Sequence, residues 1–272
     1  MRIRFQWLAV PAFALLCLPA LADTHARKAL DPAKATIAEI QSCMSANLIG
    51  RAALRDLAVK VTDREGKEHA LRMKLYWKPD TSGRTRLNLR LMEPAATRGS
   101  SYLMLQNGGQ EEVYFWLPGG DRALRITGQN TGEPLWGTDF SYAEIKQVLG
   151  LIALGDSTRL TDATVEKRPT YVLETRTALA DSGYSKVLSY VDRATCTLLK
   201  SEFFAKGDKP RKVLDADVSS LLQADQYWTV LGYTMRDLRA GSRTRVDLSD
   251  FSVDERLPER LFEPKRFFEP FE

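Results

Sequence analysis

Alternation of apolar and polar side chains is the sequence feature that most constrains this fold. Apolar residues occupy every second position in three short runs, 57–61, 71–77 and 87–91. A period of two gives a β-strand one apolar and one polar face. The breaks between the runs are short and rich in Asp, Gly, Ser and Pro, which form tight turns. The sequence therefore predicts antiparallel strands joined by hairpins in sequence order.

The strand pattern continues, with one interruption, almost to the end of the chain. Strands expected at 101–106 and 113–117 are apolar on both faces, which indicates cover on both sides or contact with a ligand. A Gly-, Asn- and Thr-rich loop is expected over 128–138. Further strands are expected at 122–127, near 159, and at 170–177, 186–192, 197–205, 211–220, 227–238 and 243–250, with a closing helical turn at 257–262. We expect one domain, 23–272, built as a long antiparallel meander.

Two helices are expected outside the strands. Apolar residues recur at three- and four-residue steps over 33–50, and Gly50 follows as a stop signal. A second helix is expected over 141–152. Ser141 and Glu144 have the spacing of a capping box, in which the two side chains satisfy each other's backbone N–H groups. One helix thus precedes the meander and one interrupts it.

The first 22 residues have the pattern of a secretory signal peptide. Arg2 and Arg4 precede an apolar run over 7–18, and a small-residue cleavage site ends at Ala22. The apolar run is too short to span a bilayer. We expect cleavage near Ala22 and an exported, soluble protein.

The charge of the mature chain argues against a nucleic-acid partner. Cleavage leaves 37 basic residues against 35 acidic residues, and the two signs are interspersed. Binding to nucleic acid needs a concentrated basic stripe. The densest basic stretch, 206–212, is interpreted as the tip of a hairpin. Acidic residues at alternate positions, such as Asp215 and Asp217, are interpreted as exposed strand charges.

Two cysteines, Cys43 and Cys196, remain after cleavage. In an exported protein they can form a disulfide, and two buried free thiols are the alternative. The sequence leaves both possibilities open. The two histidines, His25 and His69, lack metal-ligand spacing to either cysteine, so we expect no metal site.

The stretch 135–145 concentrates polar and aromatic residues but does not form an enzyme motif. A nucleophilic Ser141 would need a base, and neither histidine is near it in the sequence. The capping box gives Ser141 and Glu144 a sufficient structural role. Phosphate-binding loops, paired-His zinc motifs and nucleophile elbows are also missing from the sequence. We therefore expect neither catalysis nor a cofactor, and Trp136 and Phe140 stay open between a core plug and a lid.

Four stretches carry a resemblance to a known family. They are Leu89–Ala95 followed by Arg98–Leu103, Tyr114–Pro118 with Arg122 and Arg125-Ile126 after it, Trp136–Tyr142, and Leu261-Phe262. Together they resemble the LolA/LolB-like family of outer-membrane lipoprotein-sorting proteins from Gram-negative envelopes. Trp136–Tyr142 is most similar to an uncharacterised branch of that family.

The resemblance implies a mainly β fold, an unclosed antiparallel β-barrel whose concave face is covered by helices. It implies a periplasmic carrier whose groove receives the acyl chains of a lipoprotein or another lipid. It also implies an inner-membrane RND-type transporter as a partner of the branch. No single binding residue can be transferred from the family.

The apolar pattern gives candidate residues for the groove. The candidate wall is Leu71, Met73, Leu75, Trp77, Leu87, Leu89, Leu91, Tyr102, Met104, Tyr114 and Trp116. The candidate lid residues are Trp136, Phe140, Ile145 and Leu149, on the expected helix at 141–152 and the segment before it. An ordinary core is the alternative for each of them.

The sequence therefore supports a monomeric, non-enzymatic carrier of acyl chains moving towards the outer membrane. The alternative is an accessory or sensor protein that docks on an RND-type transporter or a signalling protein. That alternative is motivated by the exposed basic hairpin expected at 206–212.

Overall fold

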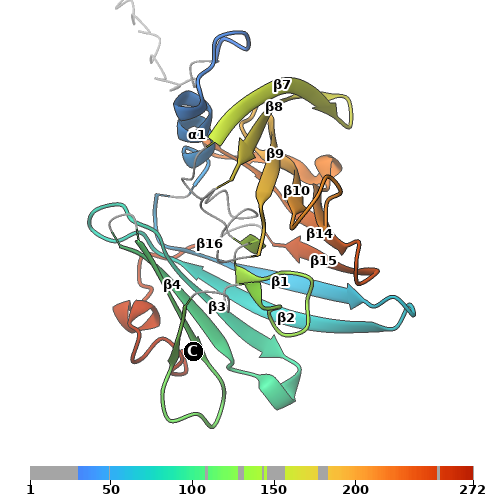
Figure 1. Cartoon of the computed structure of the whole chain (residues 1–272). Helices are drawn as coiled ribbons and strands as arrows, with labels where there is room; N and C mark the ends of the chain where they lie inside the picture. Colours follow the sequence, from blue (N-terminus) through green and yellow to red (C-terminus); the bar gives the residue numbers. More distant parts are fainter. Residues whose placement is uncertain are drawn as a thin grey trace, which may run out of the picture.

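Strands are the main secondary structure of the chain (Figure 1). The computed structural model describes residues 30–48, 50–107, 110–127, 132–142, 144–145, 157–176, 183–249 and 252–271. The expected signal peptide and its cleavage site lie outside these ranges, as does most of the helix expected over 141–152.

The strands form two consecutive antiparallel meanders. The first contains β1 (Ala53–Thr62), β2 (Glu68–Trp77), β3 (Arg86–Glu93), β4 (Ser101–Asn107), β5 (Gln110–Trp116) and β6 (Leu124–Ile126). The second contains β7 (Ser157–Val165), β8 (Arg168–Thr175), β9 (Lys186–Asp192), β10 (Leu198–Phe204), β11 (Lys212–Ala216), β14 (Gly232–Asp237) and β15 (Ser242–Leu248). Short 3-10 helices occur at η1 (Ala95–Thr97), η4 (Val218–Ser220) and η5 (Glu259–Phe262).

Strand β1 joins the two meanders, because it pairs with β2 on one side and with β15 on the other. The strand order is β6-β5-β4-β3-β2-β1-β15-β14-β11-β10-β9-β8-β7, and the short β16 (Ser252–Val253) also pairs with β1. Within the described ranges this gives one curved sheet of 14 strands, in which no ladder joins β6 to β7. The predicted unclosed antiparallel barrel is confirmed.

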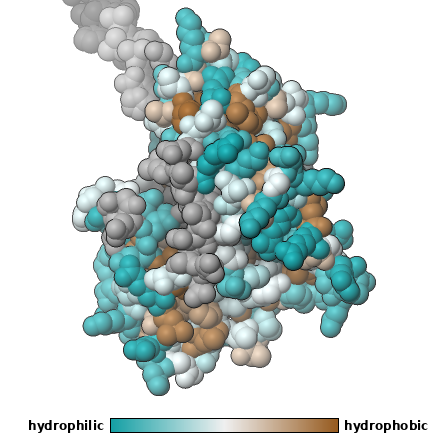
Figure 2. All heavy atoms as spheres, viewed as in Figure 1, coloured by the Kyte–Doolittle hydropathy of each residue, from teal (hydrophilic) through white to brown (hydrophobic). Residues whose placement is uncertain are grey.

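The two faces of the sheet carry separate apolar clusters. The larger cluster gathers side chains from both meanders, such as Leu75 and Met235, on the side towards which the sheet curves. We call this side the inner face. On the outer face, the C-terminal segment 257–271 packs against residues such as Tyr76. The alternation predicted from the sequence explains this division, because consecutive residues of a strand point to opposite faces. The visible surface is mostly hydrophilic, with apolar side chains gathered in a few patches (Figure 2).

Helix α1 (Ile37–Ser45) covers part of the inner face. Its first turn is closed by a capping box, in which Glu39 N donates to the Thr36 hydroxyl and Thr36 N donates to the Glu39 carboxylate. Ile40 and Met44 lie one helical turn apart and are buried in the inner-face cluster. The helix predicted over 33–50 is therefore in the right place, although α1 is shorter.

One predicted strand, 227–238, is wrong, because the structure divides it in two. Residues Tyr227–Val230 form β13, which pairs with β12 (Leu221–Ala224) in a separate two-stranded sheet. The turn between them uses Asp225 at a φ of 53°. This hairpin was missed because its turn contains no glycine, the residue that signals such turns most strongly.

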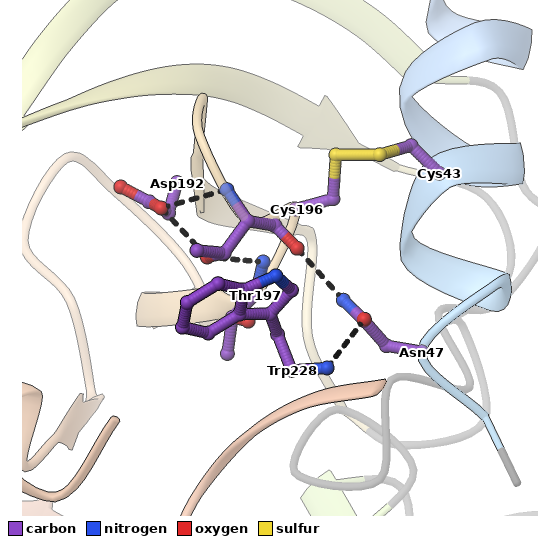
Figure 3. The surroundings of a disulfide bond; sticks show 7 residues. Cys43, Asn47, Asp192, Cys196, Thr197 and Trp228 are labelled. Atoms are coloured by element: carbon purple, nitrogen blue, oxygen red, sulfur yellow. Dashed lines mark hydrogen bonds between the residues drawn. A yellow bond between two sulfur atoms is a disulfide. The ribbon is translucent and has the colours of Figure 1, made fainter. Parts of the chain in front are cut away.

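A disulfide bond joins Cys43 of α1 to Cys196, in the turn between β9 and β10 (Figure 3). The two Cα atoms are 5.8 Å apart. Asp192 holds the turn, since its carboxylate accepts hydrogen bonds from Thr195 N at 2.9 Å and from Arg168 Nη2 at 2.8 Å. The pairing that the sequence left open is thus present, and it ties α1 to the second meander.

Replacing both cysteines, Cys43→Ser with Cys196→Ser, is expected to lower the free energy of unfolding by about 2–5 kcal/mol. The cross-link restricts the unfolded chain over a sequence separation of 153 residues. Urea denaturation of the oxidised protein measures the change. A reductant should lower the midpoint of the wild type and leave that of the variant unchanged; equal midpoints for both proteins under oxidising conditions would contradict the prediction.

Candidate functional site

One of the cavities that the described residues form on the inner face has a volume of about 120 Å³, and we call it the larger cavity. Four parts of the chain enclose it. Met44 comes from α1, Thr197 from the turn between β9 and β10, Trp228 from β13, and Trp77 and Leu248 from the sheet. Its lining mixes apolar side chains with polar ones, including Arg55. An engineered apolar cavity of roughly 150 Å³ takes up benzene, so this space suits a fragment of a hydrocarbon chain.

The smaller cavity, of about 50 Å³, lies under the segment 132–145. Leu57, Val59 and Val246 of the sheet form its floor, and Phe140 is among the residues of the segment that line it. Apart from Thr138, the described residues that line it are apolar. It therefore offers a hydrocarbon-like space.

The two cavities follow one another along β1. Leu75 and Leu248 line both of them. Arg55 is the cross-strand partner of Leu75 and lines the larger cavity, whereas Leu57, two residues on, is the partner of Leu248 and lines the smaller one. Residues two apart on a strand share a face. A row of inner-face side chains on β1 thus leads from one cavity to the other.

Asn47 holds one wall of the larger cavity together. Its amide donates to Thr195 O at 2.9 Å, and its oxygen accepts from Trp228 N at 2.9 Å (Figure 3). It therefore links the end of α1 to the β9–β10 turn and to the β12–β13 hairpin. With the disulfide nearby, this wall combines a covalent and a polar attachment.

The segment over the smaller cavity begins with a turn. Trp136 and Gly137 adopt positive φ angles of 47° and 74°, and Thr138 N donates to Leu135 O at 2.9 Å. The Trp136 ring packs edge-on against Tyr102, with the centroids 5.0 Å apart. Glycine accepts such a φ without strain, whereas a tryptophan rarely does. The turn therefore directs the Trp136 side chain to the cavity that it lines.

A buried polar cluster anchors the other end of this segment. Glu144 is fully buried and accepts hydrogen bonds from Ser141 N, the Tyr184 hydroxyl and Lys212 Nζ, the last at 3.0 Å. Lys212 Nζ also donates to Asp139 O at 2.7 Å. Burial raises the pKa of Tyr184, and the Glu144 carboxylate raises it further, so the phenol stays a neutral donor.

Asp139 ties the segment to β15. Its carboxylate accepts from the hydroxyls of Ser242 and Thr244, the latter at 2.7 Å, and its N–H donates to the Thr244 hydroxyl at 2.8 Å. Two carboxylates and one ammonium group thus hold residues 139–144 against β11 and β15. Such buried polar groups are stable only when they are paired and hydrogen-bonded.

The predicted capping box is only half present. Glu144 accepts from Ser141 N as predicted, but the Ser141 hydroxyl is buried without a partner among the described residues. The described residues therefore provide no base to activate this hydroxyl. Within the same ranges, no group of three or more His, Cys, Asp and Glu side chains could hold a metal ion. No helix of the described part is long and apolar enough to cross a membrane.

The structure brings many of the predicted groove residues to the two cavities. Met73, Leu75, Trp77, Leu89, Trp136, Phe140 and Ile145 line one or both of them. Leu71, Leu87, Leu91, Tyr102 and Met104 belong to the inner-face cluster but do not line a cavity. Leu149 lies outside the described residues.

Tyr114 and Trp116 are corrections, because they lie on the outer face. The Trp116 ring stacks on Phe268 of the C-terminal segment, with the centroids 4.6 Å apart. The second half of β5, residues 113–116, is apolar on both faces, so its alternation could not tell which face is the inner one. Val113 is the β5 residue that is buried in the inner-face cluster.

The basic stretch 206–212 is partly corrected as well. Lys212 is only 3% exposed and pairs with Glu144, so it is not part of an exposed hairpin tip. The sequence predicts that the Lys212 side chain lies on the inner face, because Lys212 is in alternation with the inner-face residues Leu214 and Ala216. Asp215 is a partly exposed strand charge, as expected, and pairs with Arg236 of the neighbouring β14. Asp217 is a correction, because it lies just after β11 and caps η4, and it pairs with Arg245 of β15.

Sequence reasoning missed the wall of the larger cavity that lies outside the main sheet. Asn47, Trp228 and Thr197 come from three elements far apart in the sequence. Only the missed β12–β13 hairpin brings Trp228 to the cavity. Arg55 could have been predicted to lie on the inner face, since it occupies the same alternate positions of β1 as Leu57 and Val59.

Replacing Lys212 with methionine is expected to lower the free energy of unfolding by about 3–5 kcal/mol, because Glu144 would keep a buried charge without its partner. Adding Glu144→Gln should recover part of the loss. Arg236→Met, which breaks an exposed ion pair with Asp215, is the control and should cost about 1 kcal/mol or less. Urea denaturation measures all three, and a cost for Lys212→Met as small as that of the control would contradict the role of the anchor.

Solved structures share this fold. A DUF1329 family protein from Desulfovibrio piger matches with a TM-score of 0.73 and 22% identity, covering 83% of this chain and 95% of that one. A protein from Vibrio parahaemolyticus, described as an outer membrane lipoprotein-sorting protein domain, matches with a TM-score of 0.71 and 21% identity over 82% and 94% of the two chains. A LolA superfamily protein from Nitrosomonas europaea gives 0.63 and 20% over 85% and 98%.

A comparison of the sequence with curated proteins found no match. A family model described as "Uncharacterized protein" matches residues 83–268, which is more than half of the chain. This range contains all four stretches that carry the resemblance, together with the segment over the smaller cavity. The chain therefore belongs to the family that this model describes, and it shares the fold of the solved LolA superfamily protein.

Proposed function

We propose that the protein is a periplasmic, non-enzymatic carrier that shelters an acyl chain of a lipoprotein or another lipid between the two membranes. In this proposal residues 23–272 act as a single monomeric domain. The cargo moves towards the outer membrane, and an inner-membrane RND-type transporter is the partner that the family resemblance suggests. The LolA-like fold supports a lipid-binding role in general, and the cavities support acyl chains in particular.

The observation that carries the proposal is the pair of cavities in series along β1. An acyl chain is long, narrow and apolar, and the inner-face row from Arg55 to Val59 offers it a floor of the same shape. The smaller cavity is lined almost entirely by apolar side chains. Neither cavity requires a reactive group for this task.

Hydrophobic burial supplies the driving force. Each buried methylene contributes roughly 0.8 kcal/mol, so about 15 methylenes offer on the order of 12 kcal/mol before entropic costs. The two cavities of about 120 and 50 Å³ hold only part of such a chain. Uptake of a whole chain therefore requires the cover to move away from the sheet.

The cover consists of α1 and the segment beside the smaller cavity. It is attached to the rest of the protein at a few defined points, so the parts between these points can move away from the sheet. Cys43 attaches α1, and Asp139 and Glu144 attach the segment beside the smaller cavity. Between these points the contacts with the sheet are mainly apolar and are the kind that an acyl chain can replace. In the proposed mechanism the side chains of Trp136 and Phe140 turn away from the sheet while the anchors stay.

The proposal is tested by extracting lipid from protein purified from the cell envelope and by titration with a fluorescent acyl probe. We expect co-purified lipid on mass spectrometry and saturable probe binding. Leu57→Trp fills the smaller cavity and should weaken probe binding by about tenfold or more, which corresponds to about 1.4 kcal/mol or more.

Ala58→Trp is the matched control, because Ala58 is exposed on the other face of the same strand. It should bind the probe like the wild type. Protein that carries no lipid and shows no saturable binding would overturn the carrier proposal. If Leu57→Trp and Ala58→Trp weaken probe binding equally, the cavities are not the binding site of the acyl chain.

A further inference from the structure

We infer that the cargo is a single-chain amphiphile with an anionic head, a carboxylate or a phosphate, and that the larger cavity binds this head. The acyl tail then extends along β1 into the smaller cavity. This inference rests on the proposed carrier function. It adds the charge of the head group, the orientation of the cargo in the site and the residues that bind the head.

Arg55 is the first observation. It occupies the inner-face row of β1 that continues with Leu57 and Val59, where the alternation would otherwise place an apolar residue. Its guanidinium donates to the Thr229 hydroxyl, with both Nη atoms 3.3 Å from the oxygen. A guanidinium is a rigid fork of donors that matches carboxylate and phosphate oxygens, and it keeps its charge in a partly buried site. It is therefore suited to an anionic head.

Tyr233 beside it does not supply a counter-charge. Burial raises the pKa of Tyr233 to about 12, against an opposing effect of the Arg55 charge. The phenol is thus neutral at physiological pH and lines the cavity as a hydroxyl group. The neutral phenol therefore adds a polar group to the cavity wall near Arg55.

Thr197 is the second, independent observation. It is 7% exposed and lines the same cavity, and its hydroxyl has no hydrogen-bond partner among the described residues. Buried hydroxyl groups in native proteins are nearly always hydrogen-bonded, so an orphaned one calls for an explanation. An oxygen of a bound head group would accept this hydrogen bond. Arg55 and Thr197 are far apart in the sequence and meet at one cavity.

The length of the two cavities together fits a head group with one acyl tail. Ala53, which lines the larger cavity, and Val59, which lines the smaller one, are separated along β1 by about 20 Å. The hydrocarbon core of a bilayer is about 30 Å thick, so one acyl chain spans roughly 15 Å. The described lining of the smaller cavity contains no charged residue, which allows the head to bind at one end only.

Displacement of the neutral fluorescent probe N-phenylnaphthylamine tests the inference. Dodecanoate, dodecyl phosphate and dodecyl alcohol have the same tail and are compared below their micellar concentrations. We expect both anions to displace the probe from the wild type at concentrations roughly tenfold to a hundredfold lower than the alcohol, the range expected for hydrogen bonds to a charged group. The relative potency of the two anions then distinguishes a carboxylate site from a phosphate site.

Variants assign the preference to the head site. Arg55→Gln should lower the potency of the anions to that of the alcohol, while the potency of the alcohol stays unchanged, and Arg55→Lys should keep part of the preference. Thr197→Val should weaken the anions by a smaller factor without lowering the thermal midpoint, because it removes an unpaired hydroxyl. Arg72→Gln removes an exposed arginine from β2 and is the control for net charge.

The outcomes separate this inference from the carrier proposal. If the probe and the alcohol bind but the wild type shows no preference for the anions, the head site is wrong and the carrier proposal stands. The head site is also wrong, with the carrier proposal intact, if Arg72→Gln lowers the preference as much as Arg55→Gln does. If neither the probe nor any of the three competitors binds, both proposals fail.

Discussion

The pairing of β1 with β15 is the constraint on which the rest of the structure depends. It joins two meanders, each of which could form from neighbouring hairpins, into one curved sheet. Because β1 then lies in the middle of that sheet, its inner-face residues are flanked by side chains of both meanders. Leu57 faces Met73 on β2 and Leu248 on β15, and both cavities lie at this junction on the inner face.

The inner face is covered by parts that are held at few points. A disulfide attaches α1, a buried ion pair attaches the segment that ends at Glu144, and Asn47 links α1 to the β12–β13 hairpin. The remaining contacts are mainly apolar packing, which has no directional requirement. Strong attachment at the ends and apolar contact between them is an arrangement in which a hydrocarbon chain can replace part of the cover without breaking the fold.

The candidate site was predictable where a strand has one apolar face. Met73, Leu75 and Leu89 were selected from alternation and lie at the cavities. Prediction failed on the second half of β5, where both faces are apolar, and it placed Tyr114 and Trp116 on the wrong side. It also treated Lys212 as an exposed charge, although the alternation of β11 directs this side chain inward. Alternation predicts which residues share a face of a strand, but it does not predict which charged side chains form a buried ion pair.

By itself, the sequence determined which residues share a face of each strand, where most turns lie and roughly where α1 lies. These are local properties, because they depend on side chains a few positions apart. Only the tertiary structure decided which face is the inner one, which strands meet at β1, and that Thr197, Arg55 and Trp228 border one cavity. These depend on contacts between distant segments, whose pairing is selected by the burial of the whole apolar surface rather than by any local pattern.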